Sequence, residues 1–511
     1  MTNTSTVRFG ALPVGAAAIL KLAIHLYAGR YYGYFGDELY YLACSHHLAW
    51  GYVDQPPLIA AIAWVVRHVL GDSLPAVRLL PALAGMVLVV LTAVLARDLG
   101  GGAFAQFLGA LGVVVAPGLL AMSNLFTMNA FEPLFWMGCA WCVVRMIKTG
   151  RRKPWIWFGV LAGVGLQNKH SMLIFGAAMV LGLLLTPERR VLASRRLWVG
   201  GAIAALIFLP NLLWNIDHHF PFLEIQENIR RNGRNVPLGP LAFFGEEALD
   251  MLPLSLPVWL AGLWFYFFAK SGRRFRALGW AWLLTAMVIV ALSPRVYYLF
   301  PAFPLLFAAG GVAWETWLAR PGLRWAKAAY PALMLAGGAL LAPLTIPVLP
   351  PETYIRYTRA IGLGQPALET HKLGPLPQIF ADQFGWPEMV ATVAGVYNSL
   401  PVDVRRNTAI FAPDYGDAAA IDLFGPRYRL PPALSGHQSY FLWGSRGYSG
   451  DSMIVMDGFG RERLESVFTS VEKVARVDHP YSMPYNHFDV YYCHGIKQPL
   501  GELWPELKKW E

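Results

Sequence analysis

The chain has 511 residues, of which 56% are hydrophobic and 14% are charged. Soluble domains carry about 25% charged residues, so this composition excludes a disordered protein and argues against a purely soluble enzyme. The formal net charge is +10, but residues 1–350 hold 27 Lys/Arg against 14 Asp/Glu, whereas residues 351–511 hold 15 against 18. The basic excess lies in the hydrophobic part, where it indicates membrane orientation rather than nucleic-acid binding.

The first 350 residues contain apolar stretches that could cross a bilayer, which takes about 20 residues. Eleven candidate spans follow in chain order: 10–28, 75–97, 103–121, 127–147, 155–168, 171–186, 197–214, 252–269, 277–293, 297–317 and 328–349. The fifth and sixth are short, so a single bent hairpin is an alternative for that pair. The apolar stretch 56–70 has 15 residues and favours an interfacial or re-entrant helix. The N-terminal segment lacks an A-x-A-like cleavage site, so we expect a retained first span.

Four clusters of Lys and Arg set the expected orientation. They lie at 148–153, 189–196, 270–276 and 320–327. With eleven spans all four clusters fall on one side, which the positive-inside rule makes cytoplasmic. This predicts a cytoplasmic N-terminus and a C-terminal segment outside the membrane.

The segment 351–511 has a different pattern. Helix-like stretches alternate with strand-like ones, the helices at 388–399, 416–424 and 460–467 and the strands at 408–412, 439–443, 452–457, 470–477 and 488–493. Such alternation is typical of a small α/β domain. The sequence therefore predicts a mainly α, polytopic membrane protein over 1–350, followed by a soluble extracytoplasmic α/β domain over 351–511.

Acidic residues of the membrane part gather on the predicted outer side. The first outer loop carries Asp37, Glu38 and Asp54, and the fourth span opens with Glu132. At a rise of 1.5 Å per residue, Glu132 lies about 7 Å below the outer end, where a carboxylate must face a cavity or a partner. Asp37 and Glu38 have an alternative interpretation, as the first turn of an interfacial helix, where carboxylates favour the helix dipole.

Two predicted outer cations break the positive-inside pattern. Lys169 lies between the fifth and sixth spans, and Arg295 precedes Tyr297 and Tyr298. Both would lie at the level of lipid phosphates, which Arg clamps with two hydrogen bonds and Lys attracts as a compact charge. The alternatives are that both cations extend to the headgroups, or that Lys169 is a structural partner of Glu132.

Three further features of the outer side stay open. His46 and His47 are weak metal candidates, because adjacent histidines lack the i, i+4 spacing of a helical metal pair. Cys44 and Cys493 are both expected outside, where a disulfide can form. The long loop 217–250 is either a charged surface loop or a substrate lid.

These features resemble a known family. The first outer loop opens with Asp37-Glu38 and continues to Asp54-Gln55-Pro56-Pro57; an R-x-Y-Y-x-x-P-x-x-P element begins at Arg295. The tail contains the strings FADQFGWPEMVATVAGVYNSLP and DYGDAAAIDLFGPRY. The chain resembles the bacterial membrane glycosyltransferases of GT-C fold that are related to protein O-mannosyltransferases and lipid A aminoarabinose transferases.

The resemblance implies an inverting transfer of a hexose or pentose from a polyprenyl-phosphate donor to a lipid, glycan or protein acceptor, at the outer face of the bacterial inner membrane. Asp37 matches the general base. The substrate-binding candidates are Glu38, Asp54, Glu132, Lys169, Arg295, Tyr297 and Tyr298. No cofactor is required by the resemblance, and the use of a divalent cation stays open. Many relatives carry an Asp where this chain has Glu132.

Two other classes of protein compete with this interpretation. A polytopic transporter or lipid flippase predicts inverted repeats and helices broken near the bilayer midplane, and the sequence shows no convincing sign of either. A non-catalytic scaffold that binds partners through its outer domain leaves the intramembrane Glu132 unexplained.

Overall fold

The computed structural model describes residues 7–29, 32–234, 238–292, 295–362 and 369–511. Its contacts group the chain into two compact units. Unit 1 comprises Met1–Arg30, Pro75–Leu213 and Pro237–Leu349, and unit 2 comprises Tyr31–Leu74, Trp214–Val236 and Pro350–Glu511. The grouping differs from the predicted division at residue 350, because two outer segments of the first 350 residues pack with the C-terminal part.

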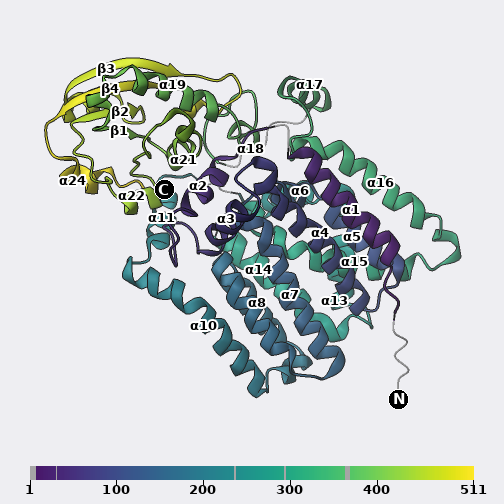
Figure 1. The fold of residues 1–511 in the computed structure, drawn as a ribbon. Coiled ribbons are helices and arrows are strands. Elements are labelled where there is room, and N and C mark those ends of the chain that lie inside the picture. Colours follow the sequence, from purple (N-terminus) through teal and green to yellow (C-terminus); the bar gives the residue numbers. More distant parts are fainter. Residues whose placement is uncertain (1–6, 30–31, 235–237, 293–294, 363–368) are drawn as a thin grey trace. The chain divides into compact units, whose positions relative to one another are not determined.

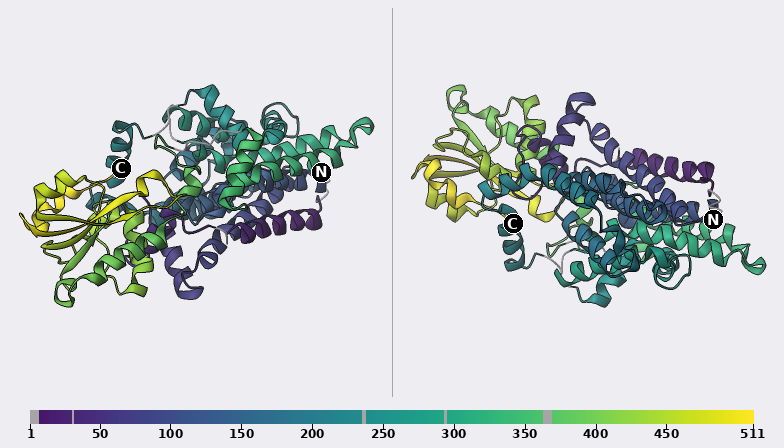
Figure 2. Two further views of the ribbon diagram at one scale, coloured as in Figure 1. Left: turned by 90° about the horizontal axis from the view of Figure 1, so that it is seen from above. Right: turned by 90° about the horizontal axis from the view of Figure 1, so that it is seen from below.

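Unit 1 is a bundle of helices that run side by side (Figures 1 and 2). In chain order its main helices are α1 Ala11–Ala28, α4 Leu74–Asp98, α5 Ala103–Val115, α6 Pro117–Asn124, α7 Met128–Thr149, α8 Pro154–Asn168, α9 Met172–Leu184, α10 Arg195–Asp217, α12 Pro240–Asp250, α13 Leu256–Phe267, α14 Arg276–Leu292, α15 Phe303–Trp317 and α16 Ala326–Leu341. Short 3₁₀ turns join several of them, among them η4 Val296–Tyr298 before α15.

Among the described residues, seven helices are long and apolar enough to cross a membrane, and two bent pairs raise the number to nine. The bent pairs are Ala103–Val115 with Pro117–Asn124, at 65°, and Pro240–Asp250 with Pro253–Phe267, at 95°. Helices α8 and α9 coincide with the predicted fifth and sixth spans, but their 15 and 13 residues are short for a crossing. The chain is thus built as a multi-pass protein, while the predicted number of eleven spans is not confirmed.

The predicted continuous span 103–121 is broken between α5 and α6. Pro117 has no backbone N–H and begins the second half, so the last carbonyls of α5 lose helical partners. Lys21 of α1 fills this gap, since its Nζ lies 3.3 Å from the Val113 carbonyl and 2.9 Å from that of Leu119. The fully buried Lys21 therefore stabilises the break.

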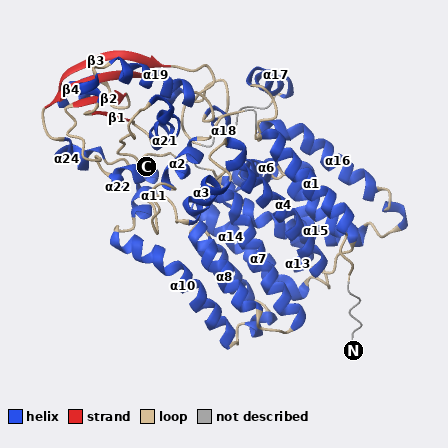
Figure 3. Cartoon of the chain, viewed as in Figure 1, coloured by secondary structure: helices blue, strands red, loops and turns tan. Residues whose placement is uncertain are grey.

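Unit 2 contains the whole sheet of the described chain, as Figure 3 shows. The strands are β1 Thr408–Phe411, β2 Ser452–Met456, β3 Phe468–Val477 and β4 Phe488–Ile496, in the order β1-β2-β4-β3. β1 pairs parallel with β2, whereas β4 runs antiparallel to both of its neighbours. The helices are α2 Gly36–Cys44, α3 Leu58–Val69, α11 Pro221–Arg231, α17 Pro351–Ile361, α18 Gln378–Ala381, α19 Trp386–Ser399, α20 Val402–Arg405, α21 Tyr415–Phe424, α22 Ser439–Trp443, α23 Arg461–Val467 and α24 Leu500–Leu503.

One predicted strand is wrong. The run 439–443 forms the short helix α22, which is bounded by Gln438 and Gly444, both with positive φ. Its aromatic residues suit a strand by composition, but strand propensity depends on packing against neighbouring strands. Here Ser439 and Tyr440 are buried as parts of a helical turn instead.

The first outer loop is held in unit 2 by hydrogen bonds to distant parts of the chain. The Trp386 indole donates to the Tyr34 carbonyl at 2.9 Å. The second outer segment is held in a similar way, because Asn228 of α11 donates to the Trp510 carbonyl at 2.7 Å and Glu224 pairs with Lys508 at 2.7 Å.

Candidate functional site

Unit 1 contains a buried ion pair between two of the predicted site residues. The Lys169 Nζ lies 3.0 Å from Glu132 Oε2, and the two side chains are 11% and 2% exposed. Glu132 lies in the second turn of α7, and Lys169 caps the C-terminal end of α8. The structure therefore contains the Glu132–Lys169 pair, which is one of the interpretations of Lys169 that the sequence left open. The pair gives the carboxylate of a membrane helix the partner that it requires.

Neighbouring polar groups, which the sequence did not single out, complete this pair. Asn129 Oδ1 accepts from Lys169 Nζ at 2.7 Å, and the Ser171 hydroxyl hydrogen-bonds to Glu132 Oε1. The Asn168 side chain donates to the Met128 carbonyl at 2.9 Å. Their closeness in the sequence to predicted site residues could have pointed to them, because each lies within four positions of such a residue. An ammonium has three N–H donors, and two of them are directed to Glu132 and Asn129.

The two predicted tyrosines face the same ammonium. Lys169 Nζ lies 4.2 Å from the ring centre of Tyr298 and 5.4 Å from that of Tyr297, and the two rings stack at 4.9 Å. Arg295 precedes them as the N-cap of η4 and is partly buried. Residues 293 and 294, which directly precede Arg295, lie outside the described residues. Unit 1 thus brings Glu132, Lys169 and the tyrosines into one cluster.

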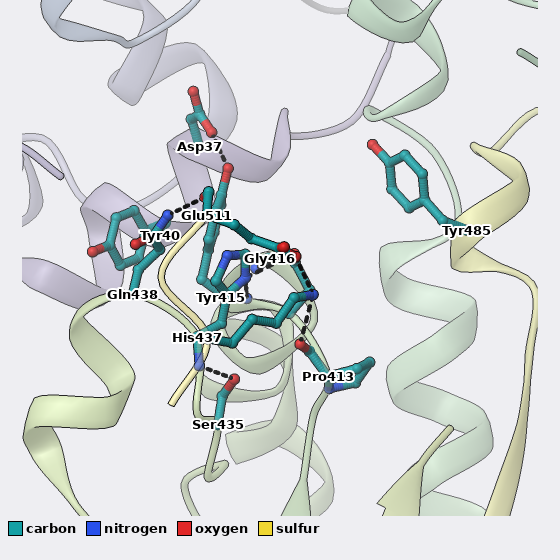
Figure 4. Close-up of polar contacts among 12 residues, drawn as sticks. Asp37, Tyr40, Pro413, Tyr415, Gly416, Ser435, His437, Gln438, Tyr485 and Glu511 are labelled. Atoms are coloured by element: carbon teal, nitrogen blue, oxygen red, sulfur yellow. Dashed lines mark hydrogen bonds and ion pairs between the residues drawn. The ribbon is translucent and has the colours of Figure 1, made fainter. Parts of the chain in front are cut away.

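Asp37, the predicted base, lies in unit 2 in the first turn of α2 and is partly buried. Its Oδ1 accepts a hydrogen bond of 2.7 Å from the hydroxyl of Tyr415, a residue 378 positions later (Figure 4). The sequence had no signal for this contact, because nothing local in either segment indicates the other.

The other two carboxylates of the first loop have different environments. Glu38 is fully buried and accepts from the Phe35 backbone N–H at 2.9 Å, so it caps α2, as the alternative interpretation expected. Asp54 Oδ1 lies 2.9 Å from the hydroxyl of Tyr40, which also hydrogen-bonds to Ser439 Oγ at 2.7 Å. Burial raises the pKa of Asp54 to about 7.

Further acids of unit 2 lie near Asp37 and were not predicted. Burial raises the pKa of Asp382 to about 7, and the carboxyls of Asp37 and Asp414 add to the rise. Burial alone would raise the pKa of Asp414, but His437 and Lys509 outweigh it and hold that pKa below the usual range. The His437 Nδ1 lies 2.9 Å from Asp414 Oδ2. The carboxyl groups near the first loop therefore differ in pKa, because some are raised above the usual value and one is lowered below it.

The weak metal candidates lie at the end of α2. The His47 ring stacks on Trp443 at 4.2 Å, and burial together with Arg446 lowers its pKa to about 4. Burial and then Arg67 lower the pKa of His46. Within the described ranges, no group of three or more His, Cys, Asp and Glu side chains is placed to hold a metal ion, and metal use stays a prediction.

The disulfide that the sequence left open between Cys44 and Cys493 is not formed in the structure. Cys44 and Cys493 are both free and buried. Gln55 Nε2 lies 3.7 Å from the Cys44 sulfur, and Cys493 belongs to β4 and lies in the core of the sheet.

The arrangement of each unit suits a distinct chemical task. In unit 2 a carboxylate held by a hydroxyl donor can accept a proton from an incoming group. In unit 1 an ammonium beside phenol rings can stabilise an anion, because fixed cations in a water-poor site act strongly on developing charge.

Comparison with known proteins gives a partial sequence match to one family and a shared fold. The profile of the dolichyl-phosphate-mannose-protein mannosyltransferase family matches residues 54–214. The lipid A galacturonosyltransferase RgtD of Rhizobium johnstonii is 27% identical over 324 residues, which span 61% of this chain and 66% of that protein. The aligned region is thus just under two thirds of the relative's length.

Solved structures of similar fold cover nearly the whole chain. ArnT from Cupriavidus metallidurans bound to undecaprenyl phosphate has a TM-score of 0.59 and 15% identity, covering 94% of this chain and 97% of that one. The oligosaccharyltransferase of Archaeoglobus fulgidus has a TM-score of 0.53 and 15% identity, covering 87% and 68%. The predicted polytopic, mainly α fold with a C-terminal α/β part is therefore confirmed. Together these findings show that the chain shares its fold with ArnT and the archaeal oligosaccharyltransferase, and that part of its sequence is similar to the mannosyltransferase family and to RgtD.

Proposed function

We propose that this protein transfers a sugar from a polyprenyl-phosphate carrier to a lipid or glycan acceptor, at the outer face of a bacterial inner membrane. The family description names a dolichyl-phosphate sugar donor, the ArnT structure holds undecaprenyl phosphate, and RgtD acts on lipid A. The four basic clusters of the sequence support a cytoplasmic N-terminus and an outer C-terminal part.

The observation that carries the proposed chemistry is the Asp37 carboxylate held by Tyr415. The acceptor hydroxyl attacks the anomeric carbon from the face opposite the phosphate, and its proton passes to Asp37. The bond between the anomeric carbon and the phosphate oxygen breaks, and the polyprenyl phosphate leaves with the electron pair. A carboxylate has about four acceptor positions, so the hydrogen bond from Tyr415 does not by itself prevent it from taking this proton. The configuration at the anomeric carbon is inverted.

The proposed carrier lipid bears a phosphate, and the cluster of unit 1 by itself suits the binding of such an anion. Lys169 and Arg295 carry two positive charges against the single negative charge of Glu132. Glu132 and Asn129 fix the direction of the Lys169 ammonium at 3.0 and 2.7 Å, so its third N–H can meet a phosphate oxygen. Tyr297 and Tyr298 add phenol groups next to it. A pre-oriented cation of this kind costs little reorganisation when the leaving group becomes charged.

The test is transfer from undecaprenyl-phosphate-linked sugars, including galacturonic acid and mannose, to lipid A by the purified protein in detergent. Asp37→Asn keeps the size of the side chain but removes the base, so we expect transfer to fall by about 10²- to 10⁴-fold. Asp451→Asn, at an exposed position of unit 2, is the matched control and should keep wild-type transfer. Equal transfer by wild type and Asp37→Asn would exclude Asp37 as the base. A transporter or flippase would instead move the carrier lipid without forming any product.

A further inference from the structure

We propose that Tyr415 is a positioning residue for Asp37, so that the C-terminal domain completes the catalytic carboxylate of the first loop. This inference rests on the proposed function and deepens it. Both residues belong to unit 2, and the contact joins the first turn of α2 to the first residue of α21.

Local structure fixes the start of α21. Asp414 caps the helix, and its Oδ1 accepts from the Gly416 backbone N–H at 2.8 Å. A Cβ on Gly416 would lie 3.2 Å from the Trp386 ring of α19, which is tight, and 3.7 Å from the Cα of Gly36, which is an ordinary contact, so the start of α21 packs directly against α19 and α2. This close approach brings the Tyr415 hydroxyl to 2.7 Å from Asp37 Oδ1.

The ring of Tyr415 is held from two sides. It lies 4.7 Å from the ring of Tyr40 and 4.8 Å from that of His437, which is itself 3% exposed. His437 Nδ1 lies within reach of both Asp414 Oδ2, at 2.9 Å, and the Tyr415 backbone N–H, at 3.2 Å. Nδ1 donates to the first when it carries a hydrogen and accepts from the second when it does not. Figure 4 shows Asp37, Tyr415 and His437 in sequence along this path. The ring contacts of Tyr415 and the hydrogen-bonding groups around His437 therefore hold the Tyr415 hydroxyl in its direction toward Asp37.

The electrostatic surroundings explain why Asp37 needs a donor. Asp54 and Asp382 interact electrostatically with Asp37, and like charges disfavour its ionised form. A hydrogen bond to the carboxylate favours that form. Burial, together with Asp37 and Asp414, raises the pKa of Tyr415 well above its usual value, with Arg234 acting weakly in the opposite direction. The phenol therefore keeps its proton and remains a donor at neutral pH.

The experiment compares Tyr415→Phe with Tyr440→Phe in the full-length protein. Tyr440 is the matched control because it is another tyrosine of unit 2, more deeply buried than Tyr415, and donates to a different carboxylate, Asp422 Oδ2, at 2.8 Å. For Tyr415→Phe we expect kcat to fall by about 10- to 100-fold, which is the range of a lost hydrogen bond to a charged group. The acid limb of the pH–rate profile should move to higher pH by about one unit, and the donor KM should stay unchanged. Tyr440→Phe should keep the wild-type kcat and pH profile.

The outcomes separate this inference from the proposed function. A Tyr415→Phe variant with wild-type kcat and profile overturns the positioning role. A fall in kcat with an unmoved acid limb also overturns it, because it indicates structural damage alone. If Asp37→Asn is inactive but Tyr415→Phe and Tyr440→Phe behave alike, the proposed base stands and only the positioning role of Tyr415 fails. If Asp37→Asn is fully active, the proposed base and the inference fall together.

Discussion

Replacing Glu132 with Gln measures how much the buried ion pair of unit 1 contributes to the stability of the protein. The Lys169 Nζ lies 3.0 Å from Glu132 Oε2, and both side chains are largely buried. At this separation and an effective dielectric constant near 20, the gross attraction is about 5 kcal/mol. Glutamine still accepts a hydrogen bond, and Asn129 and the Tyr298 ring remain as partners. We therefore expect a net loss of about 3 kcal/mol of stability.

The assay is a double-mutant cycle of Glu132→Gln and Lys169→Gln, read as the apparent melting temperature of the purified protein. At about 2 °C per kcal/mol, each single variant should melt about 6 °C below wild type. Each single variant leaves one buried charge without its partner, and the double variant leaves none. The double variant should therefore lose about 2 kcal/mol less than the sum of the two. Additive losses would refute the ion pair as a coupled unit.

A second measurement on the same variants separates the two interpretations that the sequence left open. If Lys169 binds the carrier phosphate, Lys169→Gln should weaken binding of undecaprenyl phosphate by about tenfold, the range of one hydrogen bond to a charged group. Glu132→Gln keeps the cation and should weaken binding much less. Equal binding by wild type and Lys169→Gln would leave the lysine with a structural role alone.

Two further predictions follow from burial and from close packing. Burial raises the pKa of Asp382 to about 7, and a raised carboxyl pKa costs stability as pH rises from the unfolded value near 4 toward 7. Asp382→Asn removes the charge but keeps an acceptor for the Tyr485 hydroxyl. It should therefore raise the melting temperature at pH 8 and leave it unchanged at pH 4. An equal effect at both pH values would contradict the raised pKa of Asp382. A Cβ on Gly310 of α15 would collide with the Val258 carbonyl of α13, so Gly310→Ala should lower the melting temperature or the yield of folded protein. Gly176→Ala on α9 is the control, because a Cβ at this position would meet no neighbouring group within 4 Å, and it should be neutral or slightly stabilising. Equal behaviour of the two glycine variants would argue against the close packing of α15 on α13.

The sequence by itself determined the class of the protein, because hydropathy and charge are local properties. Apolar runs located the apolar helices of unit 1 but not the number of spans, and the strand and helix patterns after residue 350 located all four strands of the sheet. Asp37, Glu132 and Lys169 were found because charged residues are costly near a bilayer and therefore stand out.

Only the tertiary structure decided which groups meet. It showed that Glu38 caps its own helix, that 439–443 forms a helix, and that the span 103–121 bends at a proline with Lys21 stabilising the break. It also joined Asp37 to Tyr415 across 378 positions of the chain. Such a contact leaves no trace in local composition, because it depends on how whole elements pack. The contact of the C-terminal domain with the proposed catalytic carboxylate could therefore be inferred only from the folded chain.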